Sequence, residues 1–328
     1  MIRSILAIIT IFSAIVPASA GGTAGYPGAF LRSGIGSRPM GMGGAFTAVA
    51  EGPDAIYYNP AGLGSAKRLD FTSSYNSLSL DRHFGYVAVS FPIRNDATMA
   101  ASWVNAGVAD VIGRGNSRQT FGEIGNNKNA FALSFAKTLH PVIAIGANLR
   151  YIQESLDDLE TFTIGFDAGA RLRPHEYASL GLAVQNLGSN YRWESSNYWS
   201  EGSTYDERFP VILKFGAAGH ILSNRLVPAI DFETSNKGGL LFRAGAEYWF
   251  TKTVIRQVPD EYEDDVFVNV EEDVRLAGLR AGIDRGTPAF GLSLFHEFGT
   301  VRFGFEYAFM LGRYGTSAGH LFTMNLGY

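Results

Sequence analysis

The residues best able to do chemistry are scattered along this chain and form no standard catalytic or metal-binding motif. The six histidines are dispersed, and neither an H-E-x-x-H nor a G-x-S-x-G motif occurs. The absence of cysteine excludes a thiolate metal site, a cysteine nucleophile and a disulfide framework. A serine–histidine pair brought together by distant strands, as in a barrel lipase, is the one enzymatic alternative. We therefore expect a protein that is not an enzyme, without metal or cofactor.

Composition points to strands rather than to a nucleotide or nucleic-acid binder. Gly34-Ile-Gly36 lacks the third glycine of a dinucleotide motif and follows no strand. A net charge of −4 without a basic stripe argues against nucleic acid as a partner. Among 328 residues, 46% are hydrophobic, only 18% are charged and 39 are glycine. This surplus of apolar residues and glycine is typical of strands joined by tight turns.

The first twenty residues read as a secretory signal peptide. Arg3 supplies the positive region, Ile5 to Val16 a short apolar run, and Ala18-Ser19-Ala20 a cleavage site. A retained membrane anchor is the alternative, but the apolar run is shorter than a spanning helix requires. No later run is long enough for a transmembrane helix. The exported chain is then either soluble or a membrane β-barrel.

Strict alternation of apolar and polar residues dominates the chain from residue 69 onward. In 301–311, one face carries Val301, Phe303, Phe305, Tyr307, Phe309 and Leu311. The other face of that segment carries Arg302, Gly304, Glu306 and Ala308. Because successive side chains of a strand point to opposite sides, each such segment has one apolar and one polar or small face.

A soluble sandwich would alternate too, and three features favour a barrel in the outer membrane instead. The apolar faces are long and end in aromatic residues, and the opposite faces are rich in small residues with charges of both signs. The chain also ends within an alternating segment, like the assembly signal of outer-membrane barrels: Phe322, Met324, Leu326 and Tyr328.

Fourteen segments of this kind predict a closed antiparallel transmembrane barrel over 67–328, with both ends on the periplasmic side. Segment 225–235 contains Pro228 and is the least regular of them. The segments are 69–76, 84–93, 97–107, 128–139, 142–155, 160–173, 177–187, 210–221, 225–235, 239–250, 274–284, 290–298, 301–311 and 318–328.

Residues 21–66 do not alternate and are predicted to form a compact plug, or hatch, inside the barrel. Glycines allow backbone angles and close approaches closed to other residues, and Asn59-Pro60-Ala61-Gly62 favours an extended residue followed by a tight turn. A disordered tail is the alternative, but the many apolar and aromatic residues of this stretch argue against it.

Three N-terminal runs, 29–38, 41–45 and 58–63, resemble the signature of the PorV/PorQ family, within the wider group of FadL-type outer-membrane transport proteins. The C-terminal runs 245–250, 279–283 and 305–308 resemble its closing hairpins. The resemblance implies a 14-stranded barrel with an N-terminal hatch carrying Gly41, Met42, Gly43, Gly44, Asn59, Pro60, Ala61 and Gly62. In FadL-type proteins the hatch moves to admit hydrophobic substrate, whereas PorV-type barrels escort secreted proteins of the type IX pathway.

Residues 251–273 depart from the family pattern, which has a short turn at this place. The insertion is strongly acidic, and 266–270 has the pattern of a further strand extending a hairpin beyond the bilayer. A docking platform and a weak Ca²⁺ site are the functional alternatives. The acidic spacing matches no EF-hand loop, so a solvated loop is favoured.

A second unusual segment is the long external loop 188–209, which is dense in aromatic residues. We expect its aromatics to contact a ligand, a partner or lipopolysaccharide, or equally to pack in the aromatic belt. These are Tyr191, Trp193, Tyr198 and Trp199.

Charges of both signs fall on the faces that should line the lumen. Structural pairing is favoured over a substrate path, because opposite charges in a narrow space pair. The residues are Arg150, Asp167, Arg171, Lys214, Asp231, Arg243, Glu247, Arg280, Asp284, Arg302 and Glu306.

Two functions remain open. As a transporter, the protein would admit hydrophobic small molecules through the gated barrel and would need an apolar cleft among residues 30–63. As a secretion component, it would bind secreted protein cargo and conduct nothing. In both cases outer-membrane lipids and the barrel-assembly machinery are expected partners.

Overall fold

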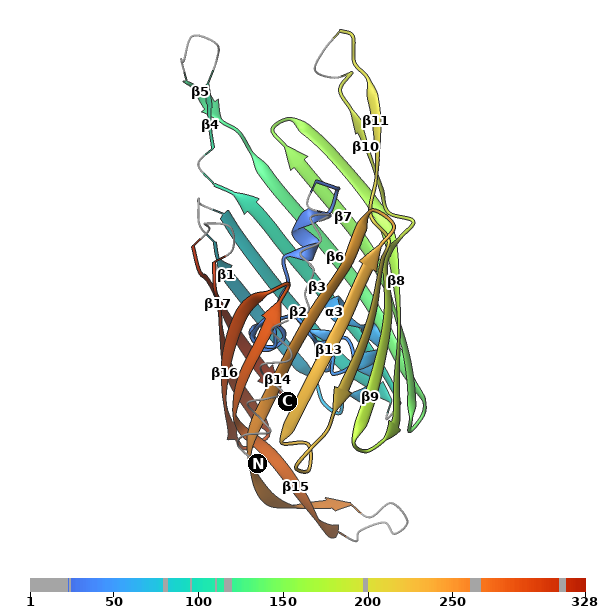
Figure 1. Ribbon diagram of the computed structural model, residues 1–328, viewed down its shortest axis with the longest axis vertical. Helices are drawn as coiled ribbons and strands as arrows, with labels where there is room; N and C mark the ends of the chain where they lie inside the picture. The colour runs from blue at the N-terminus through green and yellow to red at the C-terminus, as the bar shows by residue number, and fades with distance from the viewer. Residues whose placement is uncertain are drawn as a thin grey trace.

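The computed structural model is a closed barrel of fourteen antiparallel strands (Figure 1). It describes residues 23, 25–78, 82–94, 96–109, 111–114, 120–196, 200–259, 267–312 and 317–328, so the expected signal peptide lies outside the described residues. Among these residues, none of the helices has the length and apolar character needed to cross a membrane.

All fourteen predicted segments are wall strands, which confirms the expected fold class. The strands, in their order around the barrel from β1, are β1 (Asp70–Ser77), β2 (Arg82–Arg94), β3 (Ala97–Val108), β6 (Asn126–His140), β7 (Ile143–Leu156), β8 (Leu159–His175), β9 (Ala178–Leu187), β12 (Ile212–Gly219), β13 (Leu226–Ser235), β14 (Gly238–Pro259), β15 (Phe267–Asp284), β16 (Thr287–Phe298), β17 (Val301–Met310) and β18 (Gly319–Gly327).

The first and last strands close the barrel. β1 pairs with β18 from Asp70↔Gly327 to Ser77↔His320, and backbone bonds between Leu69 and Tyr328 continue the ladder. We call this end of the barrel the termini end and the opposite end the loop end. Pro228 fits into β13 because pairing with β12 has already stopped at Ala229, so that side of the ladder does not need its missing N–H.

The apolar faces of the strands point outward and the polar faces inward. Leu133 and Met324 are 62% and 66% exposed, whereas Glu306 and Thr323, on inward-facing positions of neighbouring strands, are 3% and 0% exposed. A soluble sandwich buries its apolar faces, so this arrangement contradicts that alternative. An apolar outer surface over a polar interior is the pattern of barrels that meet lipid.

The N-terminal segment, residues 25–66, lies inside the barrel (Figure 1). It forms four short helical pieces: η1 (Ala29–Arg32), α2 (Ser37–Gly41), α3 (Ala55–Tyr58) and η2 (Pro60–Ser65). α2 contacts β15 to β18, and η2 contacts β3, β6, β7 and β8. Most of its side chains are buried, among them Phe46, Ile56 and Leu63, so it is a packed body rather than a loose tail.

Three hairpins project beyond the wall. Two leave the loop end: β4 (Ile112–Arg114) with β5 (Thr120–Glu123), and β10 (Asn190–Glu194) with β11 (Thr204–Arg208). The third is the extension of β14 and β15 beyond the termini end, which confirms the expected longer hairpin as a continuation of both strands. It follows a register shift after Phe250 and turns away from the wall (Figure 1). Residues 260–266, which include five of the acidic residues of the insertion, lie outside the described residues.

Candidate functional site

The glycine-rich part of the N-terminal segment lies backbone to backbone against the wall. A Cβ on Gly282 of β15 would lie 2.2 Å from the carbonyl carbon of Met42, and one on Gly245 of β14 would lie 2.2 Å from the Met42 oxygen. Gly43 has φ +65°, and its own Cβ would meet the backbone of Ile283. Side chains are therefore excluded from both surfaces, which explains glycine in the segment and in the two strands.

Asn59 fastens the segment to the opposite side of the barrel. Its side chain is fully buried and donates to the carbonyl oxygens of Thr47 at 2.9 Å and Ala170 at 3.1 Å. Its oxygen accepts from the N–H of Ala61 at 3.1 Å and caps η2, with Pro60 at the first position. An amide supplies both donors and acceptor at one buried point, which no apolar residue can do.

A further anchor comes from β13. One carboxylate oxygen of Asp231 accepts from the backbone N–H of Phe46 at 3.0 Å and of Thr47 at 2.9 Å. The Thr47 hydroxyl donates to the same oxygen at 2.6 Å. These bonds satisfy backbone donors that would otherwise be orphaned in the interior.

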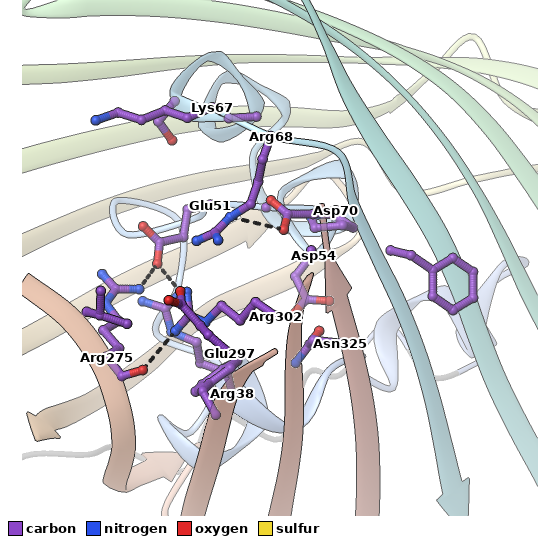
Figure 2. Close-up of a pocket in the computed structure, with 18 of the residues that line it drawn as sticks. Arg38, Glu51, Asp54, Lys67, Arg68, Asp70, Arg275, Glu297, Arg302 and Asn325 are labelled. Carbon is purple, nitrogen blue, oxygen red and sulfur yellow. Dashed lines mark hydrogen bonds and ion pairs between the residues drawn. The ribbon is translucent and has the colours of Figure 1, made fainter. Parts of the chain in front are cut away.

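An ion-pair network joins α2 to the wall near the termini end. Arg38 donates to both carboxylate oxygens of Glu247, at 2.6 and 2.9 Å, and Arg280 donates to Glu247 at 3.2 Å. Glu51 of the segment lies between Arg38 and Arg275 and pairs with both (Figure 2). The guanidinium carbons of Arg38, Arg275 and Arg280 all lie within 5.3 Å of the centre of the Trp249 ring. The segment is thus held by charge as well as by shape.

Most of the predicted lumen charges lie inside the barrel and pair there. Arg150 pairs with Asp167 at 2.7 Å, and Arg243 pairs with Glu233 at 2.8 Å and Asp284 at 2.9 Å. Lys214 lies 3.8 Å from Glu233, and Glu306 lies 3.8 Å from Arg280.

Arg171 and Arg302 depart from the expected pairing. Each donates to a backbone carbonyl, Arg171 to Ala50 at 3.0 Å and Arg302 to Arg275 at 3.1 Å. Neither makes an ion pair with a carboxylate within the described part of the chain. Both side chains line cavities at the termini end, Arg302 the larger one and Arg171 the smaller one.

The cavities around the segment differ in character from one end to the other. Two polar cavities of about 330 Å³ and 190 Å³ lie at the termini end and share Arg38, Glu51, Ser65 and Arg275. A crevice of about 40 Å³ lies beside η1 and is of mixed character, lined by Tyr57 and Tyr58 but also by charged residues such as Lys214, Glu233 and Arg243. The mostly apolar space beneath Leu31, between Ile56, Tyr86 and Val104, measures only about 10 Å³. The apolar cleft expected for a transporter is thus present only as a collapsed space, far below the size of a ligand pocket.

Asp54 is the one carboxyl of the segment without an ion pair among the described residues. It is 8% exposed, one of its oxygens has no hydrogen-bond partner, and a Cβ on Gly36 would lie 2.6 Å from the other. Burial, with a smaller contribution from Glu306, raises the pKa of Asp54 from 3.8 to about 7, against the opposing effect of Arg38 and Arg280. The carboxyl therefore changes charge near neutral pH.

The buried position of Asp54 predicts that the free energy of unfolding of the protein depends on pH. Because the folded-state pKa is raised, the favourable contribution of protonated Asp54 is complete below pH 4 and is lost as the pH rises to about 7. We expect Asp54→Asn to be more stable than the wild type at pH 8, by about 4 kcal/mol at most, with a smaller difference at pH 5. Urea unfolding in lipid vesicles at both pH values measures this. The control Asp206→Asn, at an exposed hairpin position, should behave like the wild type; an unchanged pH dependence in Asp54→Asn would contradict the prediction.

The structure places the remaining predicted residues as follows. Phe322, Met324, Leu326 and Tyr328 all lie exposed on the outer face at the end of the chain. Of the aromatic residues in 188–209, Tyr191 fits neither expectation, external contact or packing in the aromatic belt, because it is fully buried against Phe209 and Trp193. It is buried because the β10–β11 hairpin folds this ring into the top of the core that contains Phe30 and Leu31. Tyr198 and Trp199 lie outside the described residues.

Sequence reasoning missed the residues that hold the segment from its own side, above all Ser37, Arg38 and Glu51, and it missed the buried carboxyl of Asp54. Arg38 ends the run 29–38, but its partner Glu247 is 209 positions away. The signal that would have found Arg38 is an arginine placed among apolar and glycine residues, since such a charge needs a buried partner.

Comparison with solved structures finds the same type of barrel in several outer-membrane proteins. The chain aligns over 90% of its length with CymD, a monoaromatic hydrocarbon channel, at 12% identity and a TM-score of 0.53, covering 96% of that chain. A FadL homologue of Pseudomonas aeruginosa aligns at 10% identity and a TM-score of 0.53, with 90% of this chain and 98% of that chain covered. The Pseudomonas putida toluene transporter TodX aligns at 14% identity and a TM-score of 0.53, with 90% of this chain and 97% of that chain covered.

At these identities the likeness establishes the fold alone: a FadL-like fourteen-stranded barrel. Neither a protein-family model nor a curated protein sequence matches the chain. The PorV/PorQ resemblance therefore rests on the sequence motifs alone.

Proposed function

We propose that this chain is an outer-membrane β-barrel that admits hydrophobic small molecules, with residues 21–66 acting as a hatch. The observation that carries the proposal is a barrel of FadL-like fold filled by its own N-terminal segment, with its apolar faces turned outward. The solved proteins of this fold include channels for monoaromatic hydrocarbons and a toluene transporter. On this proposal the termini end is periplasmic, the mature chain begins after residue 20, and the lipids of the outer membrane cover the outer face.

Transport through this barrel requires the segment to move. The space beneath Leu31 is too small for any substrate, and the lumen around it is filled with paired charges. A hydrophobic molecule cannot displace such pairs without leaving buried charges uncompensated. Passage therefore needs a shift of the segment that opens the apolar space while the wall stays closed.

An engineered disulfide tests this motion. Because the chain has no native cysteine, the two introduced cysteines can pair only with each other within one molecule. The Ser37 hydroxyl of the segment lies 2.8 Å from that of Thr323 on β18, and the Ser74 hydroxyl of β1 lies 2.9 Å from the same atom. Ser37→Cys with Thr323→Cys links hatch to wall, whereas Ser74→Cys with Thr323→Cys links wall to wall. Uptake of labelled toluene and of a labelled fatty acid into proteoliposomes is the measurement.

We expect oxidation to reduce uptake by the hatch-to-wall pair to the level of empty vesicles, and dithiothreitol to restore it. The wall-to-wall pair should transport in both states. Equal uptake by the oxidised and reduced hatch-to-wall pair would rule out gating by this segment. Failure of the wild type to admit either probe would rule out transport itself.

The charge-filled lumen favours a second candidate, a non-conducting secretion component of PorV/PorQ type that binds secreted protein cargo. Its binding surfaces would be the projecting hairpins, including the extension of β14 and β15. The same uptake experiment separates the candidates, because this one predicts no uptake by the wild type. A variant lacking 252–272 with cargo handling unchanged would remove the docking role of that extension.

A further inference from the structure

One cavity at the termini end carries more positive than negative charge. The 190 Å³ cavity, which we call the basic cavity, is lined by four guanidinium groups, from Arg38, Arg171, Arg173 and Arg275. Only two carboxylates line it, those of Glu51 and Glu247. The neighbouring 330 Å³ cavity has the opposite balance, with more acidic than basic residues. The positive excess is therefore local to the basic cavity.

The two carboxylates are already engaged by other cations. Glu247 is held by Arg38 and Arg280, and Glu51 by Arg38 and Arg275. This leaves Arg171 and Arg173, which make no ion pair with a carboxylate among the residues that the structure describes. Arg171 donates to the Ala50 carbonyl, and Arg173 donates to the side-chain oxygen of Asn224 at 3.3 Å. Each is bonded to a neutral acceptor only.

The geometry of the two arginines suits an anion. They are two positions apart on β8, so both point to the inner face of the wall. The hydroxyl of Ser179 on the neighbouring strand β9 lines the same cavity and is bonded to His220 at 3.0 Å. Planar guanidinium forks bind phosphate and carboxylate groups through paired hydrogen bonds. Arg173 is exposed, so the cavity can be reached from the termini end.

Charges removed from water are ordinarily paired in proteins, and of the two arginines it is Arg171 that is partly buried. Arg38, Arg150, Arg243, Arg275 and Arg280 follow this rule within the barrel. From the unneutralised pair beside an accessible cavity we infer that the basic cavity is a binding site for a small oxyanion, a phosphate or carboxylate group held by Arg171 and Arg173. This inference does not depend on the transport proposal.

Isothermal titration of the folded protein in a non-ionic detergent at low salt tests the site, with inorganic phosphate and hexanoate as the two probes. We expect Arg171→Gln with Arg173→Gln to weaken binding about tenfold or more. Arg173→Gln alone leaves the bond to Ala50 in place, so it should weaken binding without disturbing the segment. The matched control is Arg192→Gln with Arg208→Gln, which removes two exposed arginines of the β10–β11 hairpin at the loop end.

The two probes also distinguish the source of the anion. Preference for phosphate indicates a phosphate-bearing solute, and preference for hexanoate indicates an amphipathic carboxylate. Either preference, when lost in the Arg171/Arg173 variant and kept in the control, supports the site. Absence of binding by the wild type, or equal weakening in the control, would overturn it.

Discussion

Gly282→Val is expected to prevent the N-terminal segment from seating in the barrel. The new side chain would overlap the backbone at Met42 and Gly43, where an added Cβ has only 2.2–2.4 Å. Backbone atoms cannot rotate away as a side chain does, so the expected loss of stability exceeds about 3 kcal/mol. With the segment displaced, the lumen is left open from end to end, and we expect a steady ion current in planar bilayers where the wild type shows only the baseline.

The control for this experiment is Gly85→Ala on β2. A Cβ at Gly85 meets nothing within 4 Å, so this variant should match the wild type in both stability and current. A Gly282→Val protein with wild-type current and wild-type protection of the segment from protease would show that the close backbone contact is not required.

Glu247→Gln is expected to have the second largest effect. Glu247 is 1% exposed and lies between Arg38 and Arg280. The amide keeps the shape but removes the charge, leaving two buried guanidinium groups facing each other. Breaking a buried ion pair from one side costs about 3–5 kcal/mol, and this should appear in the urea unfolding free energy in lipid vesicles.

A double substitution separates charge from packing at this site. Adding Arg38→Met to Glu247→Gln removes one of the two cations that Glu247 neutralises, so part of the lost stability should return, while Arg280 retains Glu306 at 3.8 Å and Glu51 retains Arg275. Glu201→Gln, at an exposed position near β11, serves as the neutral control. Strictly additive effects of the two substitutions would contradict a direct coupling between Arg38 and Glu247.

The wall of the barrel was predictable because each strand carries its own signal. Alternation with a period of two is a local property, and it identified even β13 with its Pro228. It also separated the apolar from the polar face of each strand, as in 301–311. Which of these faces points outward depends on whether water or lipid surrounds the molecule. No single segment decides this, and the sequence favoured an apolar face turned toward lipid only when all the segments were considered together.

The site was less predictable because its partners are far apart in the chain. Sequence reasoning placed Glu247 and Asp231 in the lumen but not their contacts with Arg38 and Thr47. It expected Arg171 to be paired, whereas Arg171 donates to the Ala50 carbonyl and makes no ion pair with a carboxylate among the described residues. Tyr191 was expected outside but is buried, because the packing of a loop onto the core leaves no periodic trace in the sequence.

The amino-acid sequence by itself determined that the chain forms fourteen alternating strands, that these close into a barrel, and that residues 21–66 are not part of the wall. These properties follow from side-chain alternation and from the need to satisfy every backbone group. Only the tertiary structure decided how the N-terminal segment is held: by close packing of Gly245 and Gly282 on the Met42 backbone, by the amide hydrogen bonds of Asn59 and by the ion pairs of Arg38. Such contacts join residues as much as 286 positions apart, and their energies depend on burial and distance, which no local pattern contains.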